Sequence, residues 1–169
     1  MKQRIGNFVF YWKKFNLLIP MIQIKRTNSS NPDFIHLVKD LDADLAIRDG
    51  DKHDFYHRYN SIDNLDFVVL AYENKTLLGC GAMKKYDRVT LEIKRMFTPK
   101  DQRGKGVARK ILAELERWAD EGGFERCILE TGVNMPEAIG LYLKSGYKLI
   151  PNYGQYIDAA DSRCFEKYI

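Results

Sequence analysis

The chain has 169 residues, a length typical of one compact domain. Apolar residues make up 45% and charged residues 30%, which excludes a wholly disordered or fibrous chain. Residues 1–20 contain four of the 27 Lys and Arg residues and no acid, so the remaining 23 balance the 23 Asp and Glu residues. The body of the chain is therefore neutral overall, and we expect no nucleic-acid partner; a nucleic-acid-associated protein that uses the basic residues 1–20 is a weaker alternative.

Three cysteines, Cys80, Cys127 and Cys164, lie far apart in the sequence, and none belongs to a Cys-x-x-Cys pair. This number and spacing predict neither a disulfide framework nor a zinc site, so we expect a cytoplasmic location. The apolar stretches within residues 8–24 are interrupted by lysines and polar residues, and they are shorter than the roughly 20 residues that cross a membrane. We therefore expect no membrane partner.

Met21 stands directly before a stretch in which apolar and polar residues alternate with the period of a strand. We therefore predict that a single domain covers residues 21–169. Residues 1–20, which carry the net positive charge, are predicted to be an N-terminal extension that the domain does not need.

The first half of the chain predicts strands and one helical region. Residues 22–26 alternate as a strand, and residues 28–33 supply turn and helix-start side chains. Helical spacing over residues 34–40 and 43–59, interrupted at Asp49-Gly50-Asp51, predicts two helices or one broken helix. Short β-branched runs joined by turn residues then predict an antiparallel meander of three strands at 67–72, 77–83 and 89–97.

The pattern changes at Gly104, after which helices and strands alternate. Apolar residues at helical spacing predict a long helix over 107–119, ended by Gly122-Gly123. The remaining elements are predicted as a strand at 126–130, a helix from Pro136 to Ser145, and strands at 147–150 and 164–169. The predicted fold class is α/β, with a mixed, mostly antiparallel central sheet flanked by helices.

Residues 102–108 lie between a predicted strand and the long helix, where glycines let backbone N–H groups turn towards an anion. A phosphate site is predicted there, although a loop that only starts a helix is the plainer alternative. Lys105 is followed by Gly106, so the loop lacks the Lys-Ser/Thr end of a Walker A motif. Arg109 occupies the third glycine position of a dinucleotide fingerprint, which excludes that motif as well.

The segments 92–97, 103–108 and 136–142, followed by Gly146-Tyr147, resemble in order and spacing the GNAT superfamily of acyl-CoA-dependent N-acetyltransferases. Arg103-x-x-Gly106-x-Ala108 fits the acyl-CoA loop of that family, and the resemblance covers about residues 66–169. It implies that acetyl-CoA is the cosubstrate and that an amine attacks its thioester directly in a ternary complex, without a metal. It also implies a splayed strand pair that holds pantetheine.

The resemblance assigns the cofactor mainly to backbone groups. The diphosphate is expected on the loop residues Arg103, Gly104, Lys105, Gly106, Val107 and Ala108, at the positive end of the helix. The pantetheine and the thioester carbonyl are expected at Met96 and Phe97, near a bulge in the preceding strand.

Two catalytic residues follow from the resemblance. Tyr142 matches the tyrosine that protonates the departing thiolate, although an aromatic core residue fits the same position. Glu92 matches a strand carboxylate that removes a proton from the amine, but a carboxylate that is solvated or paired with Lys94 is equally consistent. Glu130 ends a strand beside the expected split, where it meets the acceptor or belongs to a turn.

Other interpretations are weaker. The Asp40, Asp42 and Asp44 series lacks the glycine of a calcium loop, and His53 and His57 lack a third ligand, so no metal is expected. The alternative function is a non-catalytic acyl-CoA-binding or sensing module of the same fold. The acceptor is expected to be a small-molecule amine or a peptide or protein amine, and the resemblance is compatible with a homodimer.

Overall fold

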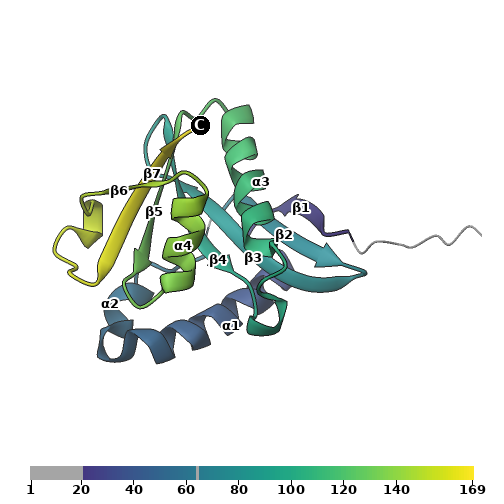
Figure 1. Cartoon of the computed structure of the whole chain (residues 1–169), viewed down its shortest axis with the longest axis horizontal. Helices are drawn as coiled ribbons and strands as arrows, with labels where there is room; N and C mark the ends of the chain where they lie inside the picture. Colours follow the sequence, from purple (N-terminus) through teal and green to yellow (C-terminus); the bar gives the residue numbers. More distant parts are fainter. Residues whose placement is uncertain (1–20, 64) are drawn as a thin grey trace, which may run out of the picture.

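The computed structural model describes residues 21–63 and 65–169, so the predicted extension over residues 1–20 lies outside the described residues. A seven-stranded sheet with the order β1-β2-β3-β4-β5-β7-β6 forms the centre of the fold (Figure 1). The strands are β1 (Gln23–Thr27), β2 (Phe67–Glu73), β3 (Thr76–Lys85), β4 (Thr90–Phe97), β5 (Arg126–Gly132), β6 (Lys148–Ile150) and β7 (Ser162–Tyr168). The helices are α1 (Pro32–Asp49), α2 (His53–His57), α3 (Val107–Glu121) and α4 (Pro136–Lys144).

The sheet is mixed and mostly antiparallel, as the sequence predicted, because only β4 and β5 pair in parallel among the strands described. The last two strands are both present, and the structure gives their order in the sheet. They are consecutive in sequence, but β7 inserts between β5 and β6. β7 pairs with β5 over its whole length, from Arg126–Tyr168 to Gly132–Ser162.

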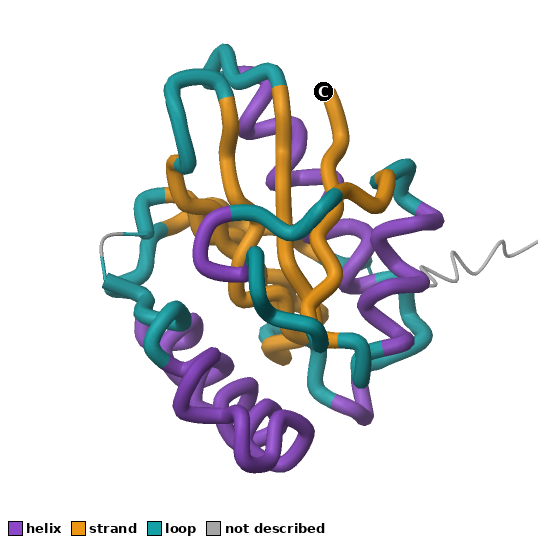
Figure 2. The backbone as a smooth tube through the Cα atoms, turned by 90° about the vertical axis from the view of Figure 1, so that its left-hand side faces the viewer, coloured by secondary structure: helices purple, strands orange, loops and turns teal. Residues whose placement is uncertain are grey.

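Helices cover both faces of the sheet, and the alternation of β2 shows how (Figures 1 and 2). Val68 and Leu70 belong to the core beneath α1, whereas Val69 and Ala71 belong to the core beneath α3. Because successive side chains of a strand point to opposite faces, a strand buried on both faces is apolar throughout. This explains the uninterrupted apolar run of β2.

The first helix is longer than its pattern suggested. Pro32 opens α1 and the Asn31 side chain accepts a hydrogen bond from the Asp33 N–H at 2.9 Å. The helix continues through residues 41 and 42, where the sequence pattern weakened, and ends before Gly50, whose φ is 51°. A short 3-10 turn (Gly50–Lys52) leads into α2, so the predicted broken helix is broken at one point only.

A bulge near the end of β4 sets up the site. Cys80 pairs with Phe97 and Ala82 with Lys94, so β4 carries one residue more than β3 between these pairs. Arg95 lies in this bulge with φ at 57°, a conformation that few non-glycine residues adopt. The bulge predicted at this end of the strand is therefore present.

β4 and β5 stop pairing just before the bulge. Their parallel pairing runs from Thr90–Arg126 to Ile93–Leu129, whereas β4 continues to Phe97 and β5 to Gly132. These two ends, which do not pair with each other, form opposite walls of an opening in the sheet, and side chains from both line the pocket described below.

Gly79 on β3 allows the end of β4 to lie close. A Cβ atom at this position would meet the carbonyl oxygen of Phe97 at 2.6 Å, so β4 would have to move. Gly79→Ala is expected to lower the free energy of unfolding by about 1–3 kcal/mol, because added volume strains a packed interior. Denaturant unfolding measures this change.

Gly140 provides the matched control, because a Cβ atom there meets nothing within 4 Å and the residue lies inside α4. Gly140→Ala is expected to raise the free energy of unfolding by about 0.5–1 kcal/mol, since alanine is the better helix former. Equal effects of the two substitutions would contradict the close approach at Gly79.

Candidate active site

Two adjoining pockets lie at the opening between β4 and β5. The loop pocket, about 290 Å³ in volume, reaches from Phe97 to the glycine loop and the start of α3. The inner pocket, about 130 Å³, reaches from Asp49 to Glu130. The two share Leu41, Met96, Met135, Ala138 and Tyr142 in their walls. A ligand in the loop pocket therefore meets a ligand in the inner pocket at Met96 and Tyr142.

The predicted cofactor residues, with one exception, come together in the loop pocket. Its walls include Met96, Phe97, Arg103, Gly104, Gly106, Val107 and Ala108. Lys105 lies outside these walls, and its ammonium group donates to the side-chain oxygen of Gln102 at 2.7 Å. Sequence reasoning missed Thr98 and Arg109, which also line this pocket; the Thr98 hydroxyl is buried without a hydrogen-bond partner among the described residues.

The loop backbone is shaped to present N–H groups. Gly104 and Gly106 have φ values of 79° and 77°, which glycine adopts without strain. Gly106 is the N-cap of α3, and no side chain caps the helix there. The first N–H groups of α3 therefore remain available to an anion beside the positive end of the helix dipole.

Arg103 is tied to the surrounding structure. Its Nε donates to the carbonyl oxygen of Thr98 at 2.9 Å, and its guanidinium lies 3.5 Å from Glu137 and 3.7 Å from Asp44. Arg48 on α1 pairs with the same two carboxylates, at 2.6 Å and 3.1 Å. These pairs connect α1, the loop and α4 along the edge of the loop pocket.

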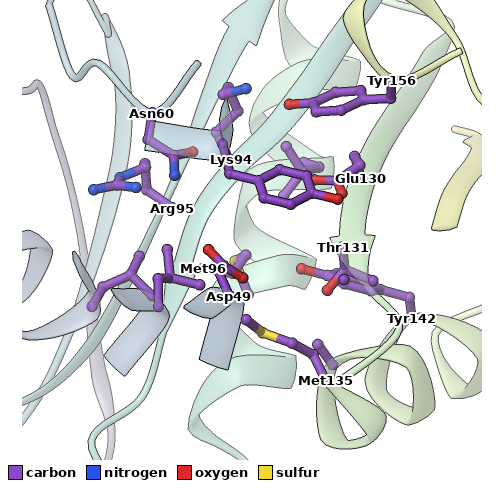
Figure 3. A pocket seen from close by; sticks show the side chains of 16 residues that line it. Asp49, Asn60, Lys94, Arg95, Met96, Glu130, Thr131, Met135, Tyr142 and Tyr156 are labelled. Carbon is purple, nitrogen blue, oxygen red and sulfur yellow. The ribbon is translucent and has the colours of Figure 1, made fainter. Parts of the chain in front are cut away.

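Tyr142 lies where the two pockets meet, on the inner side of α4 (Figure 3). It is 5% exposed, and its ring packs against Tyr147 and Phe165. Burial, and to a smaller extent the charge of Glu130, raises the pKa of the Tyr142 phenol. The hydroxyl therefore keeps its proton at neutral pH and is available as a donor.

Glu92 lies outside both pockets. It is 6% exposed; its carboxylate accepts a hydrogen bond from the Tyr153 hydroxyl at 3.0 Å and lies 3.4 Å from the Lys94 ammonium. The pairing with Lys94, left open by the sequence, is thus what the structure contains. Glu92 and Lys94 are two residues apart on β4 and share one face of the strand.

Glu130, on β5, lines the inner pocket opposite Asp49 and Asn60 (Figure 3). One carboxylate oxygen accepts a hydrogen bond from the Ser162 hydroxyl at 2.5 Å. Burial raises the pKa of Glu130 to about 7, against the opposing effects of Ser162 and Lys94. A carboxylate with this pKa can accept and return a proton near neutral pH. The available sequence signal was its place at the end of a strand beside the split.

Comparison with known proteins identifies the family. The family model of the GNAT acetyltransferases matches residues 32–147. The chain belongs to the GNAT acetyltransferase family. This confirms the family resemblance, and the mixed, mostly antiparallel sheet with its flanking helices confirms the predicted fold class.

Individual relatives of this GNAT chain differ in how much they share with it. It is 36% identical over 88 residues to the uncharacterized N-acetyltransferase YsnE of Bacillus subtilis strain 168. The matched segment covers 51% of this chain and only 58% of YsnE. It is 27% identical over 140 residues to the IAA acetyltransferase of Azospirillum brasilense, covering 82% of this chain and 92% of the relative. The crystal structure of PaiA N-acetyltransferase from Thermoplasma acidophilum in complex with coenzyme A has a TM-score of 0.67 at 18% identity, over 88% and 99% of the two chains.

The cysteines of this GNAT protein, all in the described part of the chain, are buried and line neither pocket. Burial raises the pKa of Cys80 and Cys127 to about 12 and that of Cys164 to about 11. A thiolate nucleophile is therefore not available at the site.

Residues 21–63 and 65–169 contain neither a metal-binding cluster nor a helix that could span a membrane. No group of three or more His, Cys, Asp and Glu side chains in these residues is arranged to hold a metal ion. None of the helices described is both long and apolar enough to cross a membrane.

Proposed function

We propose that this chain is an N-acetyltransferase that moves an acetyl group from acetyl-CoA to an amine by direct attack within a ternary complex. The observation that carries the proposal is the junction of the two pockets at Met96 and Tyr142. One pocket ends at a loop of free N–H groups suited to a diphosphate, and the other holds a carboxylate whose pKa is about 7. Binding both reactants side by side supplies much of the rate by positioning.

The cofactor is proposed to occupy the loop pocket. The N–H groups of residues 103–108 and the start of α3 would bind the diphosphate, and Arg103 would add positive charge at the rim. Pantetheine would lie along the free end of β4, where the backbone of Met96 and Phe97 would orient the thioester and polarise its carbonyl.

The acetyl transfer needs one base and one acid. An amine arrives as an ammonium ion at neutral pH, so it must lose a proton before its nitrogen can attack. The nitrogen then bonds to the thioester carbon, the carbon–sulfur bond breaks, and the thiolate takes up a proton from the acid. The nitrogen releases its second proton to leave a neutral amide, and this proton replaces the one that the acid gave. Tyr142 is the proposed acid, since its hydroxyl lies at the junction of the pockets and remains protonated.

Glu130 is proposed as the base in place of Glu92. Glu130 lines the inner pocket, whereas Glu92 lies outside it and is already paired with Lys94 and Tyr153. The pKa of Glu130, raised to about 7, suits a group that takes a proton from an ammonium ion and releases it again near neutral pH.

The charges of the inner pocket favour a cationic acceptor. Its two basic side chains are already paired, Lys94 with Glu92 at 3.4 Å and Arg95 with Asp42 at 2.5 Å. Asp49 is 14% exposed, lies 3.8 Å from the Nδ1 atom of His53, and has its pKa raised by burial. Asp49 and Glu130 thus supply the acidic character of the pocket, which supports an amine without a carboxylate of its own.

Asp49→Asn is expected to raise KM for such an amine about tenfold with a smaller change in kcat, because it removes an attraction made before the reaction begins. The decisive measurement is initial-rate kinetics with a matched pair such as butylamine and 4-aminobutanoate. Asp40→Asn is the control, since Asp40 is an exposed residue of the same helix. An unchanged preference for butylamine over 4-aminobutanoate in Asp49→Asn would exclude Asp49 from acceptor selection.

Two assays test the proposed function as a whole. Calorimetric titration of acetyl-CoA, with a fragment lacking the diphosphate as a control, is expected to show saturable binding that requires the diphosphate. Release of free CoA thiol is then expected to depend on an added amine. Binding without turnover across a broad panel of amines would favour the non-catalytic module instead.

A further inference from the structure

Ser162 connects the proposed base to another part of the fold. It begins β7, is fully buried and pairs with Gly132 across the β5–β7 ladder. Its hydroxyl donates to Glu130 at 2.5 Å, the length of a strong hydrogen bond to a carboxylate. A serine hydroxyl has one hydrogen, so this bond uses it while Glu130 is charged.

Tyr56, on α2, continues this chain of hydrogen bonds. Its hydroxyl lies 3.3 Å from the oxygen of Ser162. Because the hydrogen of Ser162 points to Glu130, Tyr56 is the donor in this contact when Glu130 is charged. The series runs from Tyr56 through Ser162 to Glu130 and joins α2, β7 and β5, which are far apart in the sequence.

Tyr56 also occupies a particular place in the cleft. It lines the inner pocket together with Glu130, and it lines a small outer pocket together with Asp161, which is paired with Lys52. The segment that carries Tyr56 begins just after the end of α1, where Asp49 meets the inner pocket (Figure 3). A shift of α2 would therefore reach the carboxylate of Glu130 through two hydrogen bonds.

We propose that Ser162 and Tyr56 are positioning residues that aim the Glu130 carboxylate into the inner pocket and keep it in its charged form. This inference rests on the proposed function, in which Glu130 is the base. On this proposal, the orientation and charge of Glu130 depend on the position of α2, which carries Tyr56 at the edge of the inner pocket.

Burial and several neighbouring groups set the pKa of Glu130, and their signs give the direction in which the pKa changes in each variant. Ser162 and Lys94, on β7 and β4, favour the charged carboxylate, whereas burial, Glu92 on β4 and Asp49 on α1 oppose it. Removing the Ser162 hydroxyl takes away a donor to the charged form, so the pKa of Glu130 rises. Removing the Tyr56 hydroxyl weakens the hydrogen bond that Ser162 donates to Glu130, so the pKa of Glu130 rises by a smaller amount.

The experiment measures the pH dependence of kcat/KM in Ser162→Ala, Tyr56→Phe and the double variant. The acid limb is expected to move up by about one pH unit in Ser162→Ala, because one hydrogen bond to a charged group changes a pKa by about that amount. In Tyr56→Phe it is expected to move up by less. The double variant is expected to match Ser162→Ala, because Tyr56 acts through Ser162. Tyr59→Phe, a phenol of the same region that lines neither pocket, is expected to leave the profile unchanged.

A second measurement determines the pKa of Glu130 directly, without any acetyl transfer. In the full chain with ¹³C-labelled glutamate carboxyl groups, the Glu130 signal is the one that disappears in Glu130→Gln, and its titration is followed in each variant. Equal Glu130 titration in wild type and Ser162→Ala would overturn the positioning role even if the protein acetylates amines. An upward shift in a protein that transfers no acetyl group would uphold the hydrogen-bonded series and refute the proposed function instead.

Discussion

Glu130→Gln is expected to lower kcat/KM for amine acetylation by roughly 10²–10⁴-fold, because the amide cannot take the proton of the attacking ammonium group. In the wild-type protein, kcat/KM is expected to rise with pH through an acid limb near 7, where Glu130 loses its proton. The variant should lose that limb. Initial rates from pH 5.5 to 9.5 with one amine measure both effects.

Stability distinguishes this result from misfolding. The pKa of Glu130 is higher in the folded chain than the ordinary value of 4.5, so the folded state loses stability as the pH rises from about 4.5 through about 7. The neutral amide does not carry this penalty. Glu130→Gln is therefore expected to be at least as stable as the wild-type protein at pH 8, as thermal unfolding will show.

Glu92→Gln is the matched comparison, since Glu92 is also a buried strand carboxylate but lies outside the inner pocket. Glu92 raises the pKa of Glu130, so its removal is expected to shift the acid limb to lower pH and to change the plateau rate only a few-fold. The reverse pattern, with the large loss in Glu92→Gln, would assign the base to Glu92.

Tyr142→Phe is expected to lower turnover by about ten- to a thousandfold while the affinity for acetyl-CoA changes little. The ring stays in place against Phe165, and only the hydroxyl at the junction of the pockets is lost. Turnover with a saturating amine and calorimetric binding of acetyl-CoA measure the two quantities separately. A loss confined to turnover indicates a group needed when the carbon–sulfur bond breaks.

Tyr147→Phe controls for the loss of a buried phenol. The Tyr147 ring contacts that of Tyr142 with centroids 5.8 Å apart, but Tyr147 lines neither pocket. Turnover is expected to stay near the wild-type rate. If Tyr142→Phe behaved in the same way, Tyr142 would be an aromatic core residue and not the acid.

Local pattern was sufficient to predict most elements of the fold. The apolar run of β2 and the helical stripe of α3 depend on neighbours in the sequence, and both were predicted within a few residues of their observed bounds. The glycine loop was equally readable, since Gly104 and Gly106 adopt the left-handed backbone that their residue type permits. Family membership followed from the order of these local motifs.

The arrangement of the site required the tertiary structure. Glu92 and Glu130 are both strand carboxylates, and the place of Glu130 at the end of its strand did not decide which of the two faces the opening between β4 and β5. That choice depends on where parallel pairing stops, on the bulge at Arg95, and on the neighbours that each carboxylate meets. Burial likewise raises the pKa of Glu130, and its donor Ser162 lies 32 residues away in the chain.

The sequence by itself therefore determined the family, the α/β class and the loop proposed to bind phosphate, because each depends on residue types at short, regular spacing. The tertiary structure decided which carboxylate faces the inner pocket, how β7 comes to lie beside β5, and how α2 reaches Glu130 through Ser162. Desolvation and hydrogen bonding between distant segments are properties of the packed chain, and so they appear only once it has folded.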